Sequence, residues 1–135
     1  MSAFVIDASA SVAIVSPEEQ TDAVLGVLDR LVAHGGFVPS LWLFETANAV
    51  RFKWSKSPTI AREALERLHS LPVEIVDIEP PVMRGSILTL AQRHTLTIYD
   101  ASYLHLAMML SLPLSTFDKA LIAAAPREGV DLLVI

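Results

Sequence analysis

The sequence predicts an α/β fold in which helices cover both faces of a mainly parallel sheet. Short apolar, β-branched runs alternate with amphipathic helical patterns along the chain. Parallel strands need crossover connections, and each face of their sheet needs helical cover. The length of 135 residues suits one continuous core, and no repeat or low-complexity linker divides it. We therefore expect a single three-layer α/β/α domain over residues 1–135.

Local signals place each element of this fold. Residues 3–6 form an apolar run that ends at Asp7, typical of a buried strand opening a parallel sheet. Apolar residues spaced i, i+3, i+4 and i+7 predict a helix over residues 21–34, which Gly35 and Gly36 end. The same reasoning predicts strands over residues 3–6, 37–39, 73–78, 112–115 and 130–135, and helices over residues 8–15, 21–34, 41–54, 59–71, 80–94, 99–110 and 118–125.

The composition excludes a disordered chain, because 53% of the residues are hydrophobic and only 19% are charged. A mean hydropathy of +0.49 raises the question of a membrane span. No apolar run reaches the roughly 18 residues that a span needs, and the best candidate, residues 101–114, contains His105 and Pro113. The N-terminus carries no basic segment of a signal peptide. We expect a cytoplasmic protein whose surplus apolar surface is covered by a partner or a second copy.

The net charge and the cysteine content limit the kinds of catalytic and binding site that this chain can form. The chain has no cysteine, which excludes disulfides, thiolate metal sites and cysteine nucleophiles. A net charge of -5 argues against a broad basic surface that binds nucleic acid. A nuclease would therefore depend on bound metal or on a local basic patch. Arg51, Lys53 and Lys119 are candidate RNA contacts, although solvated surface cations explain them equally well.

Four acidic residues fall where a parallel sheet binds its ligands, which is beyond the carboxyl ends of the strands. Asp7 and Asp118 follow predicted strands, Asp100 opens a predicted helix, and Glu45 lies near the start of another. We call Asp7, Glu45, Asp100 and Asp118 the acidic quartet. Aspartate is also a favoured N-cap, so each aspartate taken alone is explained equally well as a helix cap.

Glu45 is the hardest of the four to explain as a surface residue. The predicted helix around it is apolar nearly all round, which is typical of a buried helix, and Ser40 is expected to cap it. A buried carboxylate needs a partner, yet Asn48 is the only polar neighbour on that face. A divalent ion that prefers oxygen ligands, such as Mg²⁺ or Mn²⁺, would make clustered carboxylates mutually compatible.

Four sequence blocks, which together span nearly the whole chain, resemble the signature blocks of PIN-domain nucleases. Each block is weak by itself, but four in the right order at suitable spacing form a specific signal. The version most similar to this chain is the VapC-type toxin of bacterial toxin-antitoxin pairs. The blocks are VIDAS at residues 5–9, PSLWLFETAN at 39–48, YDASYL at 99–104 and STFDKAL at 115–121.

This resemblance implies a five-stranded parallel sheet and an Mg²⁺- or Mn²⁺-dependent endoribonuclease. It also implies a homodimer and a cognate VapB-like antitoxin that blocks the site. The acidic quartet matches the catalytic and metal-binding positions, with Ser9 and Thr116 at supporting hydroxyl positions and Asn48 one helical turn after the glutamate. On this interpretation Asp7 and Asp100 are the firmest metal ligands, and the other two acids complete the cage or orient the attacking water.

Two alternatives stay open. A receiver-like phosphorelay domain shares the size and the strand-end acids, but it needs an acidic pair after the first strand, where this chain has Asp7 followed by Ala8. The predicted strand that runs into Asp77 keeps this alternative open. The second alternative is a catalytically silent binding module with the PIN fold. The four histidines show no i, i+4 pair, so a zinc site has little support.

Overall fold

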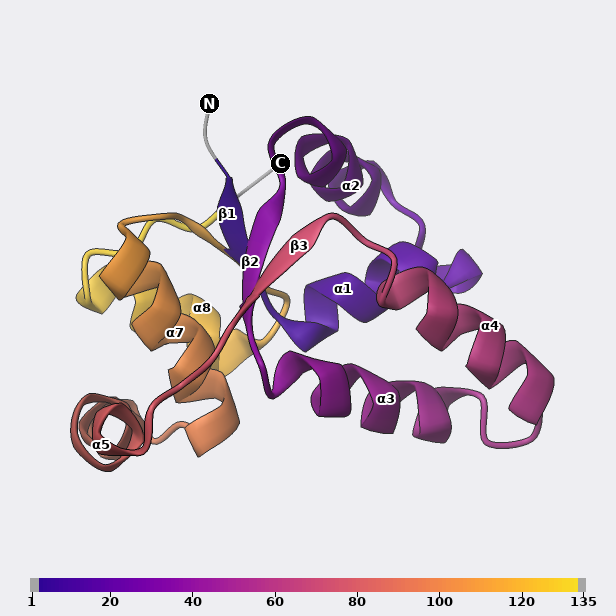
Figure 1. The fold of residues 1–135 in the computed structure, drawn as a ribbon. Coiled ribbons are helices and arrows are strands. Elements are labelled where there is room, and N and C mark those ends of the chain that lie inside the picture. The colour runs from indigo at the N-terminus through magenta and orange to yellow at the C-terminus, as the bar shows by residue number, and fades with distance from the viewer. Residues whose placement is uncertain (1–2, 134–135) are drawn as a thin grey trace.

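A parallel four-stranded sheet forms the centre of the molecule (Figure 1). We describe residues 3–133 of a computed structural model. The strand order is β3-β2-β1-β4, and every neighbouring pair is parallel. The predicted α/β architecture with a parallel sheet is therefore confirmed. The strands are β1 (Phe4–Ile6), β2 (Gly36–Pro39), β3 (Val73–Val76) and β4 (Leu114–Ser115).

Helices lie on both sides of this sheet (Figure 1). On one side are α1 (Ala8–Val15), the short η1 (Pro17–Glu19), α2 (Asp22–His34), α3 (Trp42–Lys53) and α4 (Pro58–Leu68). On the other side are α5 (Pro80–Val82), η2 (Met83–Ile87), α6 (Leu88–His94), α7 (Ile98–Leu110) and α8 (Lys119–Arg127). Within residues 3–133, no helix combines the length and the apolar character that crossing a membrane requires.

The expected fifth strand is wrong for the part of the chain that the structure describes. In place of a strand over residues 130–135, Leu132 makes a single parallel bridge to Leu114. The Leu114 amide donates to the Asp131 carbonyl, and the Leu133 amide donates to the Leu114 carbonyl, both at 2.9 Å. A single bridge does not make a β-strand. Residues 134–135 of the predicted strand lie outside the described residues.

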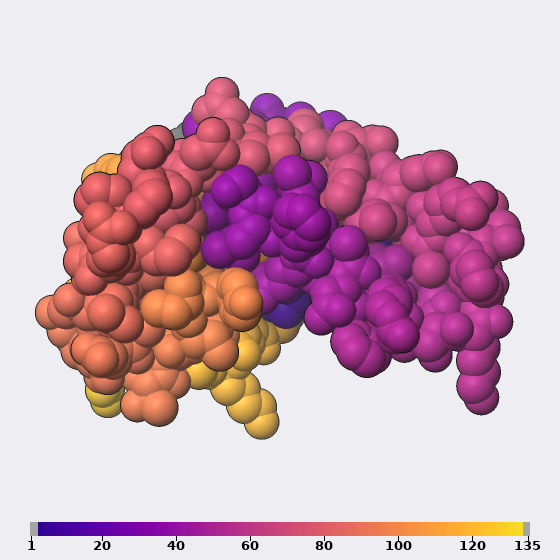
Figure 2. Space-filling view, turned by 60° about the horizontal axis from the view of Figure 1, so that its bottom comes forward, coloured from indigo at the N-terminus to yellow at the C-terminus, as the bar shows by residue number. Residues whose placement is uncertain are grey.

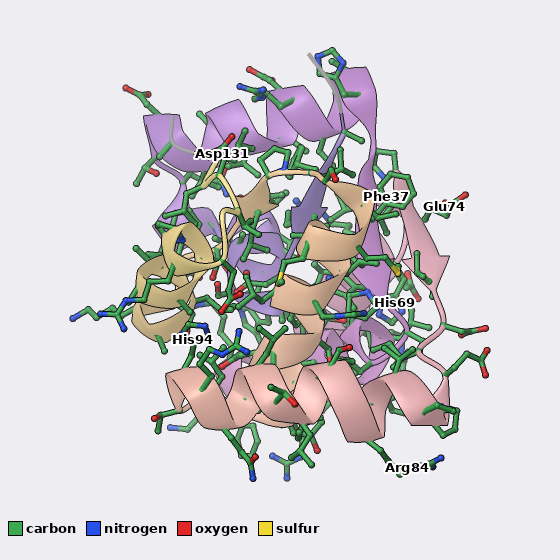
Figure 3. The ribbon with its side chains drawn as sticks, turned by 90° about the vertical axis from the view of Figure 1, so that its left-hand side faces the viewer. Phe37, His69, Glu74, Arg84, His94 and Asp131 are labelled. Carbon is green, nitrogen blue, oxygen red and sulfur yellow. The ribbon has the colours of Figure 1, made fainter. Side chains whose placement is uncertain are left out.

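The expected single helix over residues 80–94 is present, with the π-helical η2 in its middle. Figure 3 shows this helical run passing across α7, with His94 at its end beside α8. Glu128, just beyond α8, accepts from Arg93 at 2.8 Å and lies 2.6 Å from Nε2 of His94. This cluster fixes the end of α6 against the end of α8.

Gly35 ends α2 as the sequence predicts, and Gly36 is the first residue of β2, one residue before the start of the predicted strand. Gly35 has a positive φ of 75°, and its amide bonds to the Leu31 carbonyl. A Cβ on Gly36 would lie 2.7 Å from Cδ1 of Leu31 and 3.3 Å from the Phe4 carbonyl oxygen. A side chain at this position would require the buried Leu31 side chain to shift, so α2 packs closely against the start of β2.

The prediction that α3 is a buried helix is wrong. Only Trp42, Thr46 and Val50 are fully buried, whereas Phe44 is 82% exposed and Phe52 is also exposed. The reason is that α3 packs through one face, against α1 and α4, and forms with α4 a hairpin that extends away from the sheet (Figure 1). An apolar sequence thus leaves aromatic side chains in solvent.

The prediction that Ser40 caps α3 is also wrong. Leu41 occupies the N-cap position in a helical conformation and makes no side-chain cap. The Ser40 amide instead donates to the Val76 carbonyl at 3.0 Å, which extends the β2 and β3 pairing by one residue. The helix therefore starts one residue later than the sequence pattern predicts, and Ser40 lies one position before the N-cap.

Candidate active site

The topology creates one natural binding position. From β1 the chain builds β2 and then β3 on one side, and it returns much later to place β4 on the other side of β1. The helices that follow β1 and β4 therefore lie on opposite faces of the sheet and open a crevice between the carboxyl ends of these strands. Asp7 directly follows β1, and Thr116 directly follows β4. The sheet thus brings together residues from the two ends of the chain.

A cavity of about 640 Å³ opens at this end of the sheet. Figure 2 shows this face of the molecule, with a hollow between the orange atoms of α7 and the purple atoms of α3 and the indigo N-terminal segment at its base. All members of the acidic quartet line this cavity. The other lining residues are Ala8, Ser9, Val12, Ala13, Glu19, Thr21, Val24, Ala49 and Phe117.

Asp7 lies at the base of the cavity and is only 3% exposed. Its Oδ1 accepts from the Ser9 hydroxyl at 2.7 Å and from the Ala10 amide at 2.9 Å, and its Oδ2 accepts from the Thr116 hydroxyl. The Ala10 bond caps α1, so Asp7 is indeed an N-cap. Because three donors hold the carboxylate, its orientation is set by the two strand ends.

The other two aspartates differ in how they are held. Asp118 caps α8, since its Oδ2 accepts from the Leu121 amide at 2.9 Å. Asp100 lies in the first turn of α7, where Thr97 rather than Asp100 supplies the cap. The capping interpretation therefore applies to Asp7 and Asp118 and fails for Asp100, so capping does not explain why Asp100 is acidic.

Glu45 reaches the cavity from α3 and meets α7 there. The Tyr103 hydroxyl donates to its Oε1 at 2.6 Å. Two further hydrogen bonds, from the Trp42 indole to the Ser11 hydroxyl at 2.9 Å and from that hydroxyl to the Asp7 carbonyl at 2.6 Å, tie α3 to α1. Together these bonds place the Glu45 carboxylate relative to Asp7.

Burial and mutual repulsion both act on these acids. Burial raises the pKa of Asp7 above its ordinary value, and the charge of Asp100 adds to the effect, against the hydrogen bonds from Ala10, Thr116 and Ser9. Burial also raises the pKa of Glu45, and the three aspartates add to this rise, while the Tyr103 hydrogen bond opposes it.

Burial and neighbouring carboxylate charges also raise the pKa values of Asp100 and Tyr103, which lie one turn apart on α7. The pKa of Asp100 is raised by burial and then by the charge of Asp118, with Thr97 acting in the opposite direction. Burial strongly raises the pKa of Tyr103, and the Glu45 charge adds to it. Tyr103 therefore stays protonated and acts as a hydrogen-bond donor. The acids are close enough in this cavity to disfavour one another's ionised forms.

The donor set fits a hard divalent cation in its chemistry, since carboxylate oxygens are the ligands that Mg²⁺ and Mn²⁺ prefer. The raised pKa values of Asp7, Glu45 and Asp100 agree with a site that gains stability from added positive charge. Within residues 3–133, however, no three acidic, histidine or cysteine side chains are already arranged to hold one ion. Binding would therefore require the side chains of the quartet to draw together.

A family model decides the classification. The model described as PIN domain matches residues 4–126. The chain belongs to the PIN-domain family. A comparison with curated proteins gave no match.

Solved structures share the fold of this PIN domain at low sequence identity. PAE2754 from Pyrobaculum aerophilum has a TM-score of 0.69 and 23% identity, over 91% of this chain and 84% of that chain. FitAcB from Neisseria gonorrhoeae has a TM-score of 0.67 and 17% identity, over 96% and 95% of the two chains. VapBC2 from Rickettsia felis, bound to a DNA fragment from their promoter, has a TM-score of 0.66 and 19% identity, over 96% of each chain.

The receiver-like alternative does not fit this PIN domain. The phosphorelay interpretation depends on Asp77, which follows β3 at the edge of the sheet. Asp77 is exposed and does not line the cavity that contains Asp7. The two aspartates are thus not placed to share one active site.

The predicted supporting residue Asn48 and the three candidate RNA contacts do not line the cavity. Asn48 is exposed on α3 and does not line the cavity. Lys53 binds two glutamates of η1, at 2.8 Å to Glu18 and 3.1 Å to Glu19, so its charge is already paired. Arg51 is exposed and lies over the Phe52 ring, and Lys119 is exposed at the start of α8. Their contact with RNA stays a prediction.

Sequence reasoning missed Tyr103 and Glu19. A signal for Tyr103 exists: it follows Asp100 by one helical turn, and the hydroxyl of a tyrosine in an apolar helix needs a partner. No comparable signal exists for Glu19, because its place at the cavity depends on how η1 folds back toward α3.

Proposed function

We propose that this PIN domain is an Mg²⁺- or Mn²⁺-dependent endoribonuclease and the toxin of a toxin-antitoxin pair. The observation that carries the proposal is the cavity at the β1 and β4 strand ends, where the acidic quartet brings together carboxylates from four separate segments of the chain and Glu19 adds a fifth. Grouping acids that repel one another costs stability, and a metal-dependent reaction gives a physical reason for that cost.

In this proposal Asp7 and Asp100 hold the ion, and Asp118 and Glu45 complete the cage or orient the attacking water. A bound Mg²⁺ or Mn²⁺ polarises the phosphate, lowers the pKa of the attacking water and stabilises the leaving oxygen. The protein's own part is to present carboxylates at fixed positions. Ser9 and Thr116 do this for Asp7, because each donates a hydrogen bond to one of its two oxygens.

Thr116 has a second role in the same arrangement. Its hydroxyl oxygen accepts from the Asp118 amide at 3.0 Å while the hydroxyl donates to Asp7. The Ser9 hydroxyl oxygen likewise accepts from the Phe117 amide at 3.0 Å. Two hydroxyl groups therefore bridge the carboxyl ends of β1 and β4 and set the spacing of the two aspartates.

Hydrolysis by an activated water predicts the ends of the products. Water adds to phosphorus, the bond to the 3′ oxygen breaks, and the proton passes to that leaving oxygen. The fragments then carry a 5′-phosphate and a 3′-hydroxyl. The reaction does not use the 2′-hydroxyl of RNA as the nucleophile.

The decisive experiment incubates the purified protein with total cellular RNA and Mg²⁺ or Mn²⁺, and sequences the fragment ends. We expect discrete cleavage that EDTA abolishes and that Asp100→Asn reduces by on the order of 100-fold or more. Asp100 is the cleanest target, because it caps no helix. Asp7→Ala should be inactive too, but it also removes the cap of α1.

The matched control is Asp77→Asn, which changes an exposed aspartate outside the cavity and should keep wild-type activity. Fragments that end in a 2′,3′-cyclic phosphate would contradict the proposed chemistry. A folded protein that binds no divalent ion and cleaves no RNA would support the catalytically silent binding module instead.

The proposed partners are RNA, a VapB-like antitoxin that blocks the cavity, and a second copy of the chain, all in the cytoplasm. Exposed aromatic side chains support a covered surface, since Phe44 and Phe52 on α3 and Tyr99 on α7 are left in solvent. Light scattering on the purified protein tests the dimer, which should have twice the 14.7 kDa mass of one chain. A neighbouring short reading frame whose product binds the protein and stops RNA cleavage would support the antitoxin.

A further inference from the structure

Tyr103 is a polar group at the site to which the proposed function gives no role. Its side chain is 0% exposed, and it lies on α7 one helical turn after Asp100. Its hydroxyl donates to Oε1 of Glu45 at 2.6 Å across a sequence separation of 58 residues. Among residues 3–133, this is the only hydrogen bond of the Tyr103 hydroxyl.

Glu45 needs such a support more than the other acids do. The Asp7 carboxylate is held by three donors and the Asp118 carboxylate by a helix amide. Glu45 has a longer side chain with more rotatable bonds, and within the described residues its carboxylate has one hydrogen-bond donor, Tyr103. Without that donor, the position of the carboxylate would be averaged over several rotamers.

We propose that Tyr103 is a positioning residue that holds Oε1 of Glu45 and leaves Oε2 for the metal or the attacking water. This inference rests on the proposed metal-dependent function. One turn of α7 then contributes to the site in two ways: Asp100 supplies a carboxylate, and Tyr103 holds the carboxylate of Glu45 on α3. A rigid, buried phenol suits this task because its ring is packed and its hydroxyl can point in few directions.

The first experiment measures Mn²⁺ binding by calorimetry for the wild type, Tyr103→Phe, Glu45→Gln and the double variant. Removing a group that orients a metal ligand weakens binding by 10-fold to 100-fold in other sites, and we expect about tenfold here for Tyr103→Phe. In the Glu45→Gln background the same change should have little effect, because the group it positions is gone.

The matched control is Tyr99→Phe, which removes the hydroxyl of the chain's other tyrosine, 58% exposed on the same helix. It should bind Mn²⁺ like the wild type. A purely structural tyrosine would behave differently: Tyr103→Phe would lower the melting temperature and leave the Mn²⁺ affinity unchanged. That result would overturn the positioning role.

A second measurement does not depend on Tyr103→Phe folding. In Tyr99→Phe, Tyr103 is the sole tyrosine, so ¹³C labelling of the tyrosine Cζ gives a single resonance that reports on the hydroxyl hydrogen bond. Adding Mg²⁺ should shift this resonance with the midpoint of Mg²⁺ binding, and Glu45→Gln should abolish the shift. A resonance that stays unmoved while Mg²⁺ binds would contradict the proposal.

The outcomes separate this inference from the proposed function. If the folded wild type binds neither Mn²⁺ nor Mg²⁺, both the metal-dependent function and the positioning role fail. If it binds the ions and Tyr103→Phe loses the same affinity with and without Glu45, the function stands and only the positioning role fails.

Discussion

The Thr116 hydroxyl donates a hydrogen bond to Oδ2 of Asp7 across 109 residues of sequence. The bond joins the carboxyl ends of β1 and β4, the two strands between which the order of the sheet reverses. Asp7 is almost fully buried, so this donor contributes both to the stability of the carboxylate and to its orientation.

Replacing Thr116 with valine keeps the shape of the side chain and removes both this bond and the acceptor of the Asp118 amide. A hydrogen bond to a charged group contributes about 1.5–3 kcal/mol, and we expect a loss of that order in the free energy of unfolding by urea at pH 7. Thr89→Val is the control, since within residues 3–133 the Thr89 hydroxyl bonds only to the exposed Gly85 carbonyl. If both substitutions lower the unfolding free energy equally, the buried hydrogen bonds of Thr116 contribute no more to stability than the exposed bond of Thr89.

Asp100→Asn should stabilise the protein in the presence of EDTA. The substitution removes a charge that raises the pKa of Asp7 and Glu45. It leaves the Thr97 cap of α7 in place and only weakens the bond between Thr97 and the side chain at position 100. Because Asp100 is partly exposed, solvent screening limits the gain to about 0.5–1 kcal/mol at pH 7. Urea unfolding measures it, with Asp77→Asn as the control. Destabilisation by Asp100→Asn would mean that the acids do not repel one another.

The stability of the metal-free protein should depend on pH through the same acids. Burial raises the folded-state pKa of Asp7, Glu45 and Asp100 above the unfolded values. Between the two values the folded state binds protons that the unfolded state does not, so these groups make the protein more stable as the pH falls from 7 toward about 4.

The difference between wild type and Asp100→Asn isolates this effect. The pKa of His105 is lowered by burial, which acts in the opposite direction below neutral pH, but it is common to both proteins. Urea unfolding in EDTA between pH 5 and pH 8 should show the variant's advantage shrinking as the pH falls. An advantage that stays constant or grows toward pH 5 would argue against raised pKa values in the cavity.

Trp42→Phe tests how α3 is fixed beside α1. The change removes the indole donor to Ser11 and part of a fully buried ring, whose centroid lies 5.4 Å from that of the tilted His69 ring. We expect a loss of about 2–4 kcal/mol in unfolding free energy. Trp54 remains as the fluorescent probe, and Trp54→Phe is the matched control. A loss below that of the control would mean that the Ser11 bond does not fix α3.

Two glycines should respond to alanine in opposite directions. A Cβ on Gly36 would meet Leu31 at 2.7 Å and the Phe4 carbonyl at 3.3 Å, so Gly36→Ala should cost about 1–3 kcal/mol. A Cβ on Gly85 would meet nothing within 4 Å, and Gly85→Ala in its helical stretch should stabilise by about 0.5–1 kcal/mol. Thermal melts of both variants compare the two positions directly, and equal shifts would contradict the packing at Gly36.

The amino-acid pattern alone was enough to predict the order of the helices and of four strands, and the placement of acids at their ends. These features depend on local physics: the period of apolar residues, the glycine that ends α2, and the preference of aspartate for helix N-termini. The acids after β1 and β4 could be assigned to one edge of the sheet, because consecutive parallel strands present their carboxyl ends together. The exposed face of α3 could not be predicted, since periodicity shows which residues are apolar and not which of them a neighbour covers.

Contacts between side chains on different elements could be identified only in the folded protein. The Tyr103 bond to Glu45 and the pairing of Lys53 with Glu18 and Glu19 join residues on different elements. Such contacts depend on distances between packed helices, which vary with every side chain at the interface and leave no periodic trace in the sequence. The acids of the site can therefore be predicted from the sequence, whereas the side chains that hold them in place can be identified only from the packed structure.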